Sequence, residues 1–559
     1  MGDRIVSDKD KSSGFEVGEI YEVVNQKRVT RRDVLKGAAA VGAVAAFGSV
    51  ASACGSSSSS SSSASPAASS SAAAGTPKKG GALKVAIGGG SAKDTLDAQI
   101  ATTETQITTQ FQMYDSLLGW DPEHKLQMLL AETYEPDATG KTHTVKLKSG
   151  LTFHDGSPVN ADAVVYSFNR ILDPKTGAIG LDMLSGLNAA GIKKVDDLTV
   201  QFTLDKPNVI FYEALAYYNN AVVPVDYAPK GMTGAIGTGP WKVTSFTPGQ
   251  QEEFAAFENY WGDGPYADTL TMIEFADPTA KLNALLGGTV DYATIIDSTQ
   301  AATLKSSPGF KPLEAKTGGW QPFTVRVDQK PFDNVDVRQA FKYILDRQQM
   351  IDQAFGGYGW LGNDMYAPFD PGYPKDLPQR TQDIAQAKSL LKKAGYDNNL
   401  TVELTCSTAT GAGGVQAAQV YAQQAKAAGV TINVKQVDPS VFYGDNYLKW
   451  TFAMDFWATR NYLPQTSVGT MPGAPYNETH WSDPNWVALV QEAMKTVDDT
   501  KRNDLITQAS TIEYNSGGNI VWSFNNLLDG YSDKITGAIP DTWGAEAANK
   551  GRFNLISFV

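Results

Sequence analysis

Apolar and polar residues alternate with a two-residue period in several short segments of this chain, which is typical of half-buried strands. This pattern predicts strands at residues 83–87, 144–147 and 198–204. Elsewhere apolar residues recur with the 3.6-residue period of amphipathic helices. We expect helices at residues 161–171, 337–354, 384–394 and 415–428.

The second half of the chain alternates between helix and strand. The helices at 384–394 and 415–428 are each followed by a glycine and then by a strand-like run, at 400–404 and 430–437. Strand–helix–strand alternation predicts a partly parallel sheet within residues 335–460. The first half has shorter strands and more turns, which favours a mixed α/β lobe.

The N-terminal segment predicts export. Arg31 and Arg32 precede an Ala/Gly/Val run at 37–53, and this arrangement resembles a twin-arginine signal. Cys54 follows at the junction, and a serine tract comes after it, so we expect a signal peptide at 1–53, a lipidated Cys54 and a flexible linker at 54–79. The mature protein would then be anchored to the outer face of the cytoplasmic membrane.

Two alternatives to this interpretation stay open. The run at 37–53 could span the membrane, although it is shorter than the roughly 20 apolar residues that a span prefers. Ala51 stands where lipoprotein signals more often have leucine, so ordinary cleavage without lipidation also fits.

Composition excludes several classes of function. The net charge of −13 and the lack of a basic cluster argue against nucleic-acid binding. With Cys54 acylated, Cys406 has no partner, so we expect a buried thiol and no disulfide framework. The four histidines lack ligand-like spacing, and we expect no metal and no cofactor. The length of the mature chain is natural for two or more lobes.

No catalytic motif stands out, and we expect no enzyme activity. The glycines at 88–90 match neither phosphate-loop pattern and predict a plain turn. Ser389 and Lys392 match an S-x-x-K pattern, but they lie on a lysine-rich helix without companion motifs and predict a solvated face. His154 beside Asp155 predicts a structural hydrogen bond in a turn.

Aromatic residues in apparent loops are the strongest candidates for a binding surface, because rings offer large contact areas at low entropic cost. They are Trp320, Tyr358, Trp360, Trp457, Tyr462, Trp481 and Trp486. Most tryptophans belong to cores, so we expect only two or three of these to line a pocket.

Five blocks, in this order, resemble the solute-binding proteins of peptide- and nickel-type ABC importers (family 5). They are LTFHDGSPVNADAVVYSF at 151–168, GTGPW at 237–241, NYWG at 259–262, PFDNVDVRQAF at 331–341 with Asp346-Arg347, and LLKKAGY at 390–396. The resemblance covers about residues 82–559. Taken alone, the residues of these blocks predict structural roles. Asn160 is expected to be the N-cap of a helix. Arg338, Asp346 and Arg347 are expected to lie on one helix and to form ion pairs on its surface.

The resemblance implies a two-lobed periplasmic-binding-protein-like α/β fold (class II, Venus flytrap) with an extra subdomain in the first lobe. We expect the first lobe at 80–318 plus 517–559, its inserted part near 115–225, and the second lobe at 319–516. A monomer would enclose a peptide or another small organic solute, and the closed form would be recognised by a membrane permease.

Peptide-binding members of this family usually follow a tryptophan in the second lobe with an aspartate that pairs with the ligand's ammonium. The matching segment here is DFWATRNY at 455–462, which places Arg460 at the aspartate position. Arginine suits a carboxylate or phosphate; alternatively it faces solvent or pairs with Asp455. An oligosaccharide, another carboxylate ligand and a sensor role remain open. The expected ligand-binding residues are Trp320, Trp360, Trp457, Arg460, Asn461 and Tyr462.

Overall fold

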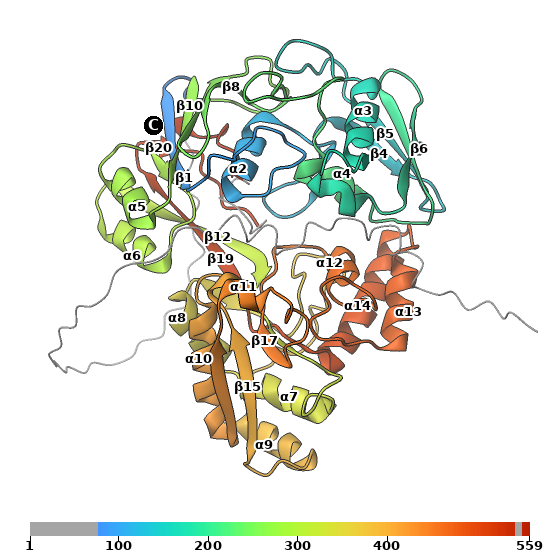
Figure 1. Cartoon of the computed structure of the whole chain (residues 1–559), viewed down its shortest axis with the longest axis vertical. Helices are drawn as coiled ribbons and strands as arrows, with labels where there is room; N and C mark the ends of the chain where they lie inside the picture. Colours follow the sequence, from blue (N-terminus) through green and yellow to red (C-terminus); the bar gives the residue numbers. More distant parts are fainter. Residues whose placement is uncertain (1–76, 543–550) are drawn as a thin grey trace, which may run out of the picture.

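The computed structural model describes residues 77–542 and 551–559, which form two α/β lobes stacked one above the other (Figure 1). The first lobe, uppermost in this view, is built on an eight-stranded and a four-stranded sheet, and the second lobe on a five-stranded sheet. Two paired strands, β12 (Phe310–Trp320) and β19 (Ser523–Ser532), lie where the lobes meet. The expected two-lobed α/β architecture is confirmed.

The eight-stranded sheet has the order β12-β19-β11-β1-β10-β9-β8, with β14 paired to β19. Its other strands are β1 (Ala82–Gly88), β8 (Trp241–Thr247), β9 (Gln251–Ala256), β10 (Thr269–Phe275), β11 (Tyr292–Ala293) and β14 (Gly359–Leu361). The helices of this part are α2 (Glu104–Met113), α5 (Pro278–Leu286) and α6 (Ser298–Ser306), and β20 (Ile535–Thr536) pairs with β21 (Ser557–Phe558). β1 runs parallel to β10 and β11 and confirms the first predicted strand.

The four-stranded sheet, with order β4-β5-β7-β6, forms the side of the first lobe at the right of Figure 1. Its strands are β4 (Ala131–Pro136), β5 (Thr142–Leu147), β6 (Leu187–Lys194) and β7 (Thr199–Leu204). Around them lie α3 (Ala161–Leu172), α4 (Tyr212–Ala216), the 3₁₀ turns η3 (Ile179–Leu184) and η4 (Tyr218–Asn220), and the hairpin of β2 (Leu118–Trp120) and β3 (Leu126–Met128). In β7 every second residue is buried, as its alternation predicts, and these residues pack with Phe168 of α3. The side chain of Asn160 accepts the Ala163 N–H at 3.1 Å, which confirms the predicted N-cap.

The five-stranded sheet of the second lobe has the order β16-β15-β17-β13-β18. Its strands are β13 (Phe323–Val325), β15 (Leu400–Cys406), β16 (Val430–Gln436), β17 (Phe452–Met454) and β18 (Asn519–Ile520). Its helices are α7 (Val335–Ile344), α8 (Arg347–Phe355), α9 (Ile384–Lys393), α10 (Gly414–Ala425), α11 (Pro439–Phe442), α12 (Tyr462–Gly469), α13 (Pro484–Ala493) and α14 (Asp499–Ser516), with the 3₁₀ turns η5 (Thr408–Thr410) and η6 (Lys426–Ala428). β15 is parallel to β16 and β17, whereas β13 is antiparallel to its neighbours, so the predicted partly parallel sheet is confirmed.

The single helix expected at 337–354 is wrong, because the chain breaks it into α7 and α8. Leu345 is extended, and the Asp346 side chain caps α8 by accepting the Gln349 N–H at 3.0 Å. At the break, the side-chain amide of Gln424 from α10 accepts the Asp346 N–H at 3.0 Å and donates to the Asp346 carbonyl at 3.1 Å. A neighbouring helix therefore satisfies the Asp346 N–H at the break, while the Asp346 carbonyl also accepts the Met350 N–H of α8 at 3.1 Å.

The expected surface ion pairs of Arg338 and Arg347 are also wrong, because both side chains are buried. Arg338 donates to the Ser516 carbonyl at 2.7 and 3.0 Å, at the end of α14. Arg347 pairs with Asp364 at 2.8 Å, and Arg380 pairs with the same carboxylate at 2.6 Å. These arginines hold the second lobe together.

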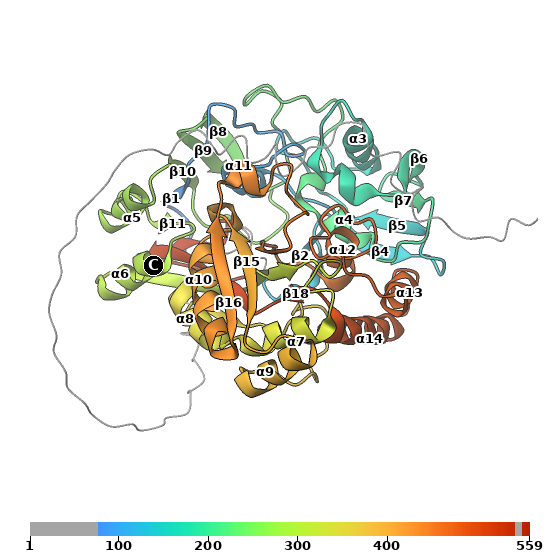
Figure 2. The ribbon, with the colours of Figure 1, turned by 60° about the horizontal axis from the view of Figure 1, so that its bottom comes forward.

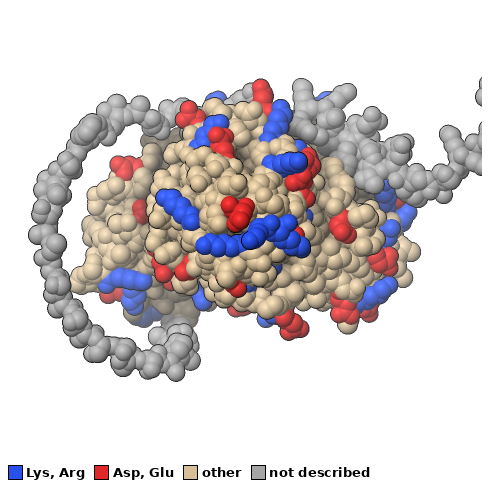
Figure 3. Space-filling model, turned by 90° about the horizontal axis from the view of Figure 1, so that it is seen from below, with Lys and Arg blue, Asp and Glu red and all other residues tan. Residues whose placement is uncertain are grey.

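The predicted solvated helix and buried thiol are both confirmed. Ser389 and Lys392 are exposed on α9, and Cys406 is fully buried. Seen from below, the second lobe carries Lys, Arg, Asp and Glu side chains interspersed on its surface (Figure 3). In the part of the chain that the structure describes, no helix has the length and apolar character needed to cross a bilayer.

The family-like blocks of the first lobe meet in a buried structural seam. A ring nitrogen of His154 donates to the Gly239 carbonyl at 2.9 Å, which confirms the structural hydrogen bond predicted for His154. The Trp261 indole donates to Asp115 Oδ2 at 2.9 Å, and Arg552 donates to the other oxygen of this carboxylate at 2.5 Å. These blocks hold the scaffold together.

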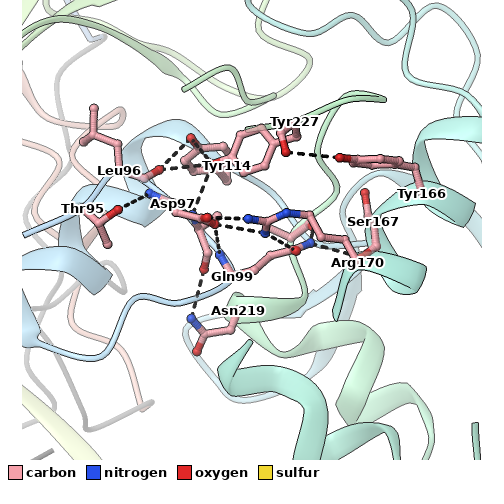
Figure 4. Close-up of polar contacts among 12 residues, drawn as sticks. Thr95, Leu96, Asp97, Gln99, Tyr114, Tyr166, Ser167, Arg170, Asn219 and Tyr227 are labelled. Carbon is pink, nitrogen blue, oxygen red and sulfur yellow. Dashed lines mark hydrogen bonds and ion pairs between the residues drawn. The ribbon is translucent and has the colours of Figure 1, made fainter. Parts of the chain in front are cut away.

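A second polar network joins the four-stranded sheet to the loop after β1 (Figure 4). Arg170 of α3 donates to Asp97 Oδ2 at 2.6 Å and to Gln99 Oε1 at 2.7 Å. The hydroxyls of Tyr114 and Tyr227 lie 2.9 Å apart beside this ion pair. The network ties α3 to the loop after β1.

Candidate functional site

The carboxyl ends of the parallel strands in the second lobe point toward the first lobe. α11 follows β16 at this edge, and the segment 455–461 follows β17 (Figures 1 and 2). In open α/β sheets, ligands bind in the crevice outside the carboxyl ends of the strands. The same edge meets the crossing strand β12, because the backbones of Trp320 and Trp457 exchange two hydrogen bonds of 2.9 Å.

Three of the predicted site residues form one column of stacked aromatic rings. The Trp457 ring lies 6.2 Å from Trp320 with an interplanar angle of 17°, and Trp320 lies 5.1 Å from Tyr366 at 15°. Tyr462 continues the column at 5.5 Å from Tyr366. Four parallel rings make a rigid platform, since each ring is fixed by its neighbours.

Tyr462 lies at the closed end of this column. Its hydroxyl accepts the Trp486 indole N–H at 2.7 Å and donates to Glu513 at 3.0 Å. Burial raises the pKa of Glu513 to about 7. Trp486 is fully buried, so this end of the column belongs to the core of the second lobe.

Arg460 lies at the Trp457 end of the column, and Asn461, next to Tyr462, contacts the first lobe. The exposed Arg460 guanidinium lies 5.5 Å from the centroid of the Trp457 ring. The Asn461 side-chain amide donates to Glu213 Oε1 on α4 of the first lobe at 2.9 Å. The two residues are therefore placed where the lobes touch.

Glu213 is a carboxylate that the sequence alone did not point to. Burial raises its pKa to about 8; the Asn461 hydrogen bond and the charge of Arg460 act in the opposite direction, and the charge of Asp370 adds to the rise. The Arg460 charge also acts on Tyr217 of the first lobe, whose pKa is raised by burial. Contacts between residues more than 200 positions apart leave no signal in local sequence patterns.

Trp360 belongs to a second group of rings between the lobes. Its indole donates to the Thr317 carbonyl at 2.9 Å, and its ring stacks on Phe524 at 4.4 Å. Phe369 lies 6.0 Å from Trp360 and 6.0 Å from His124, a residue of the first lobe in the β2–β3 turn. This group adds an aromatic wall next to β12 and β19.

A small cavity of about 50 Å³ opens between α4 and the second lobe. Its walls include Ile210 and Tyr212 from the first lobe and Asp370, Asn461 and Arg502 from the second. Burial raises the pKa of Asp370. The cavity offers the Tyr212 ring, the Arg502 cation and the Asp370 carboxyl to a bound molecule, whereas the rings of the column are at most 4% exposed.

Among the described residues, no group of three or more His, Cys, Asp or Glu side chains is placed to hold a metal ion. The predicted export and lipidation residues Arg31, Arg32 and Cys54 lie outside the described residues.

Comparisons with known proteins agree with this geometry. The model of the bacterial extracellular solute-binding proteins, family 5 Middle, matches residues 125–476, and that of the twin-arginine translocation signal matches residues 28–48. The glutathione-binding protein GsiB of Pectobacterium atrosepticum is 27% identical over 483 residues, which cover 81% of this chain and 91% of that protein.

Two solved structures have a similar fold. The crystal structure of the ABC transporter substrate-binding protein CtaP from Listeria monocytogenes matches with a TM-score of 0.75 at 23% identity, covering 86% of this chain and all of that one. DppA from Helicobacter pylori, in complex with the peptide STSA, matches with a TM-score of 0.67 at 19% identity, covering 86% of this chain and 98% of that one.

Proposed function

This chain belongs to the family 5 bacterial extracellular solute-binding proteins, and from that membership we propose that it captures a carboxylate-bearing peptide or peptide-like solute on the Trp457 platform. It is an exported solute-binding protein of an ABC importer, with a twin-arginine signal, and it is not an enzyme. The carboxylate preference is our inference from Arg460.

The position of Arg460 carries the proposal. Its guanidinium lies over the Trp457 ring and its charge acts on Glu213 and Tyr217 of the first lobe. A guanidinium binds a carboxylate through two parallel N–H···O bonds, and it would repel a ligand ammonium. Glutathione, the ligand named in the relatives, carries two carboxylates and one ammonium, and its carboxylates are of the class that Arg460 would bind.

The working cycle follows from two-lobed geometry. We assign the first lobe to about residues 80–318 plus 517–559, with its inserted part near 115–225, and the second lobe to about 319–516. β12 crosses into the second lobe, and the chain returns through β19, a few residues after 517, because β18 still pairs with β13 in the second-lobe sheet. A solute that contacts both lobes stabilises the closed form, and the permease recognises that form. We also assign Trp320, Trp360, Asn461 and Tyr462 to this site, either as residues that contact the solute or as residues that support the platform. We further propose that the protein acts as a monomer.

Substitution of Arg460 tests the proposal. Isothermal titration calorimetry with glutathione and with acetyl-trialanine should show affinities about 10-fold to 100-fold weaker for Arg460→Ala, because a charge-assisted hydrogen bond is lost. Lys435→Ala, which removes an exposed cation of the same lobe, should bind like the wild type. Unchanged affinity in Arg460→Ala would exclude the proposed carboxylate contact.

We further propose that Cys54 carries a lipid that tethers the mature protein to the outer face of the cytoplasmic membrane. The cysteine follows the apolar stretch of the signal directly and precedes a serine tract. In Cys54→Ser cells, immunoblotting should find the protein in the medium or the soluble fraction. Retention of Cys54→Ser protein in the membrane fraction would contradict the tether.

A further inference from the structure

The cavity of about 50 Å³ between α4 and the second lobe has walls from both lobes, and we call it the inter-lobe cavity. Ile210 and Tyr212 form its first-lobe wall, and α12 and α14 of the second lobe lie opposite α4 (Figure 1). A single water needs about 10–15 Å³, so the cavity has room for a group of about four or five heavy atoms.

Direct bonds between the lobes border the inter-lobe cavity. The side-chain amide of Asn461, which lines it, donates to Glu213 of α4 at 2.9 Å. Next to Ile210, the Val209 N–H donates to the Met494 carbonyl of the second lobe at 3.2 Å. The cavity therefore forms when the lobes come together, and a group bound in it contacts both of them. Such a group stabilises the closed form.

Arg502 brings a positive charge to the second-lobe wall. It lies on α14, and its side chain is 14% exposed. Its Nη1 donates to the Thr496 and Val497 carbonyls at 3.0 and 3.1 Å, and its Nη2 donates to Asp499. Among the described residues, these bonds use three of the five N–H donors of a guanidinium and leave two for a bound carboxylate.

Asp370 brings a negative charge to the same wall. It is 5% exposed, and its Oδ1 and Oδ2 accept the Gly372 and Tyr462 N–H groups, each at 2.8 Å. Each carboxylate oxygen has a second lone pair, so Asp370 can also accept from a bound ammonium. The charge of Arg502 acts on Asp370, which places the two charged groups near each other.

From this geometry we propose that the inter-lobe cavity binds a free α-amino-acid head group of the solute, with its α-carboxylate on Arg502 and its α-ammonium on Asp370. The head group matches the cavity in size and carries one charge of each sign. A carboxylate alone would be repelled by Asp370, and an ammonium alone would be repelled by Arg502.

The inference rests on the proposed function, because it adds a second contact for the solute whose other carboxylate pairs with Arg460. Asn461 lines the cavity and follows Arg460 directly, so a small solute is long enough to reach both places. The solute is then a peptide-like molecule with one residue linked through its side chain, because only that linkage leaves an α-ammonium and an α-carboxylate free on the same carbon.

Three matched probes test the head group. γ-Glutamyl-alanyl-glycine carries the complete head, glutaryl-alanyl-glycine lacks the α-ammonium, and 4-aminobutanoyl-alanyl-glycine lacks the α-carboxylate. All three keep the terminal carboxylate that Arg460 would bind, and acetyl-trialanine carries this carboxylate alone. In calorimetry with the wild-type protein, the complete probe should bind at least about 10-fold tighter than either truncated probe.

Two variants assign these preferences to the cavity. Asp370→Asn should reduce the preference over the glutaryl probe to less than about 3-fold, and Arg502→Gln should do the same for the preference over the aminobutanoyl probe. Lys501→Ala and Asp504→Asn, which change exposed charges of α14, are the matched controls and should retain both preferences.

A third variant keeps the test decisive if Asp370→Asn fails to fold, since Asp370 also holds the Tyr462 N–H at the start of α12. Ile210→Phe places a larger side chain in the first-lobe wall and changes no charge. It should reduce both preferences to less than about 3-fold.

The possible failures are distinct. If acetyl-trialanine binds the wild type and the three head-group probes bind equally, the inference is overturned and the carboxylate contact of Arg460 stands. Preferences that persist in both Arg502→Gln and Ile210→Phe also overturn it. If none of the four probes binds the wild type at millimolar concentration, both this inference and the proposed carboxylate-bearing ligand fall.

Discussion

Arg347 and Arg380 converge on one carboxylate, Asp364, and all three side chains are at most 2% exposed. The sequence suggested a surface ion pair for Arg347, because nothing local reveals that Asp364 and Arg380 lie around it. Buried charges are stable only when they are paired, so the energetic role of this cluster is much larger than that of a surface pair.

Removing the shared carboxylate should therefore be costly. Asp364→Ala leaves two buried guanidinium groups without their counter-ion, and we expect the free energy of unfolding to fall by about 3–5 kcal/mol. Urea denaturation measures the loss. Glu403→Ala, which breaks the exposed pair with Lys435, should cost no more than about 1 kcal/mol. Similar losses of unfolding free energy in the two variants would show that the buried cluster stabilises the protein no more than the exposed pair does.

At the scale of elements, the break between α7 and α8 shows how a neighbour overrides a local pattern. The apolar period continues through Leu345, but Asp346 caps a new helix and its backbone is bonded to Gln424 of α10. A capping residue inside a helical pattern is thus a local sign of the break, and the Gln424 contact makes the break stable.

The cap makes a measurable contribution. Asp346→Ala removes the acceptor of the Gln349 N–H and should lower the free energy of unfolding by about 0.5–2 kcal/mol. Asp346→Asn keeps an accepting oxygen and should lie close to the wild type in the same denaturation experiment. An alanine variant as stable as the wild type would mean that Gln424 alone maintains the break.

At the scale of the whole molecule, the contact between Asn461 and Glu213 joins the lobes, and the buried Glu213 carboxyl makes the stability of the fold depend on pH. Burial raises the pKa of Glu213 to about 8, above its ordinary value of 4.5. Between these two values the folded protein holds a proton that the unfolded chain has released, so stability falls as the pH rises. Glu252, whose pKa burial raises to about 8, adds to the same trend.

A difference measurement isolates Glu213. Glu213→Gln cannot ionise, so relative to the wild type it should gain stability as the pH rises from 5 to 8 and stop gaining above that. Thermal denaturation at each pH gives the curve. A constant difference between Glu213→Gln and the wild type would mean that the carboxyl between the lobes does not titrate there.

The sequence determined by itself what depends on short-range patterns. The alternation of apolar and polar residues predicted the strands β1, β5 and β7. The strand–helix–strand order predicted the parallel strands β15 and β16. The export signal and the five ordered blocks indicated an exported two-lobed binding protein. These features follow from local propensity and from which face of an element is apolar, so they can be read from neighbouring residues.

Only the tertiary structure decided which distant residues meet. It stacked Trp457, Trp320 and Tyr366 into one platform, placed Glu213 against Asn461, and gathered Asp455 and Glu478 around Tyr447. It also buried Arg338 and Arg347, which the sequence assigned to a surface. The charges and rings of a binding site act over a few ångströms in space, and chain folding alone brings residues hundreds of positions apart to that distance.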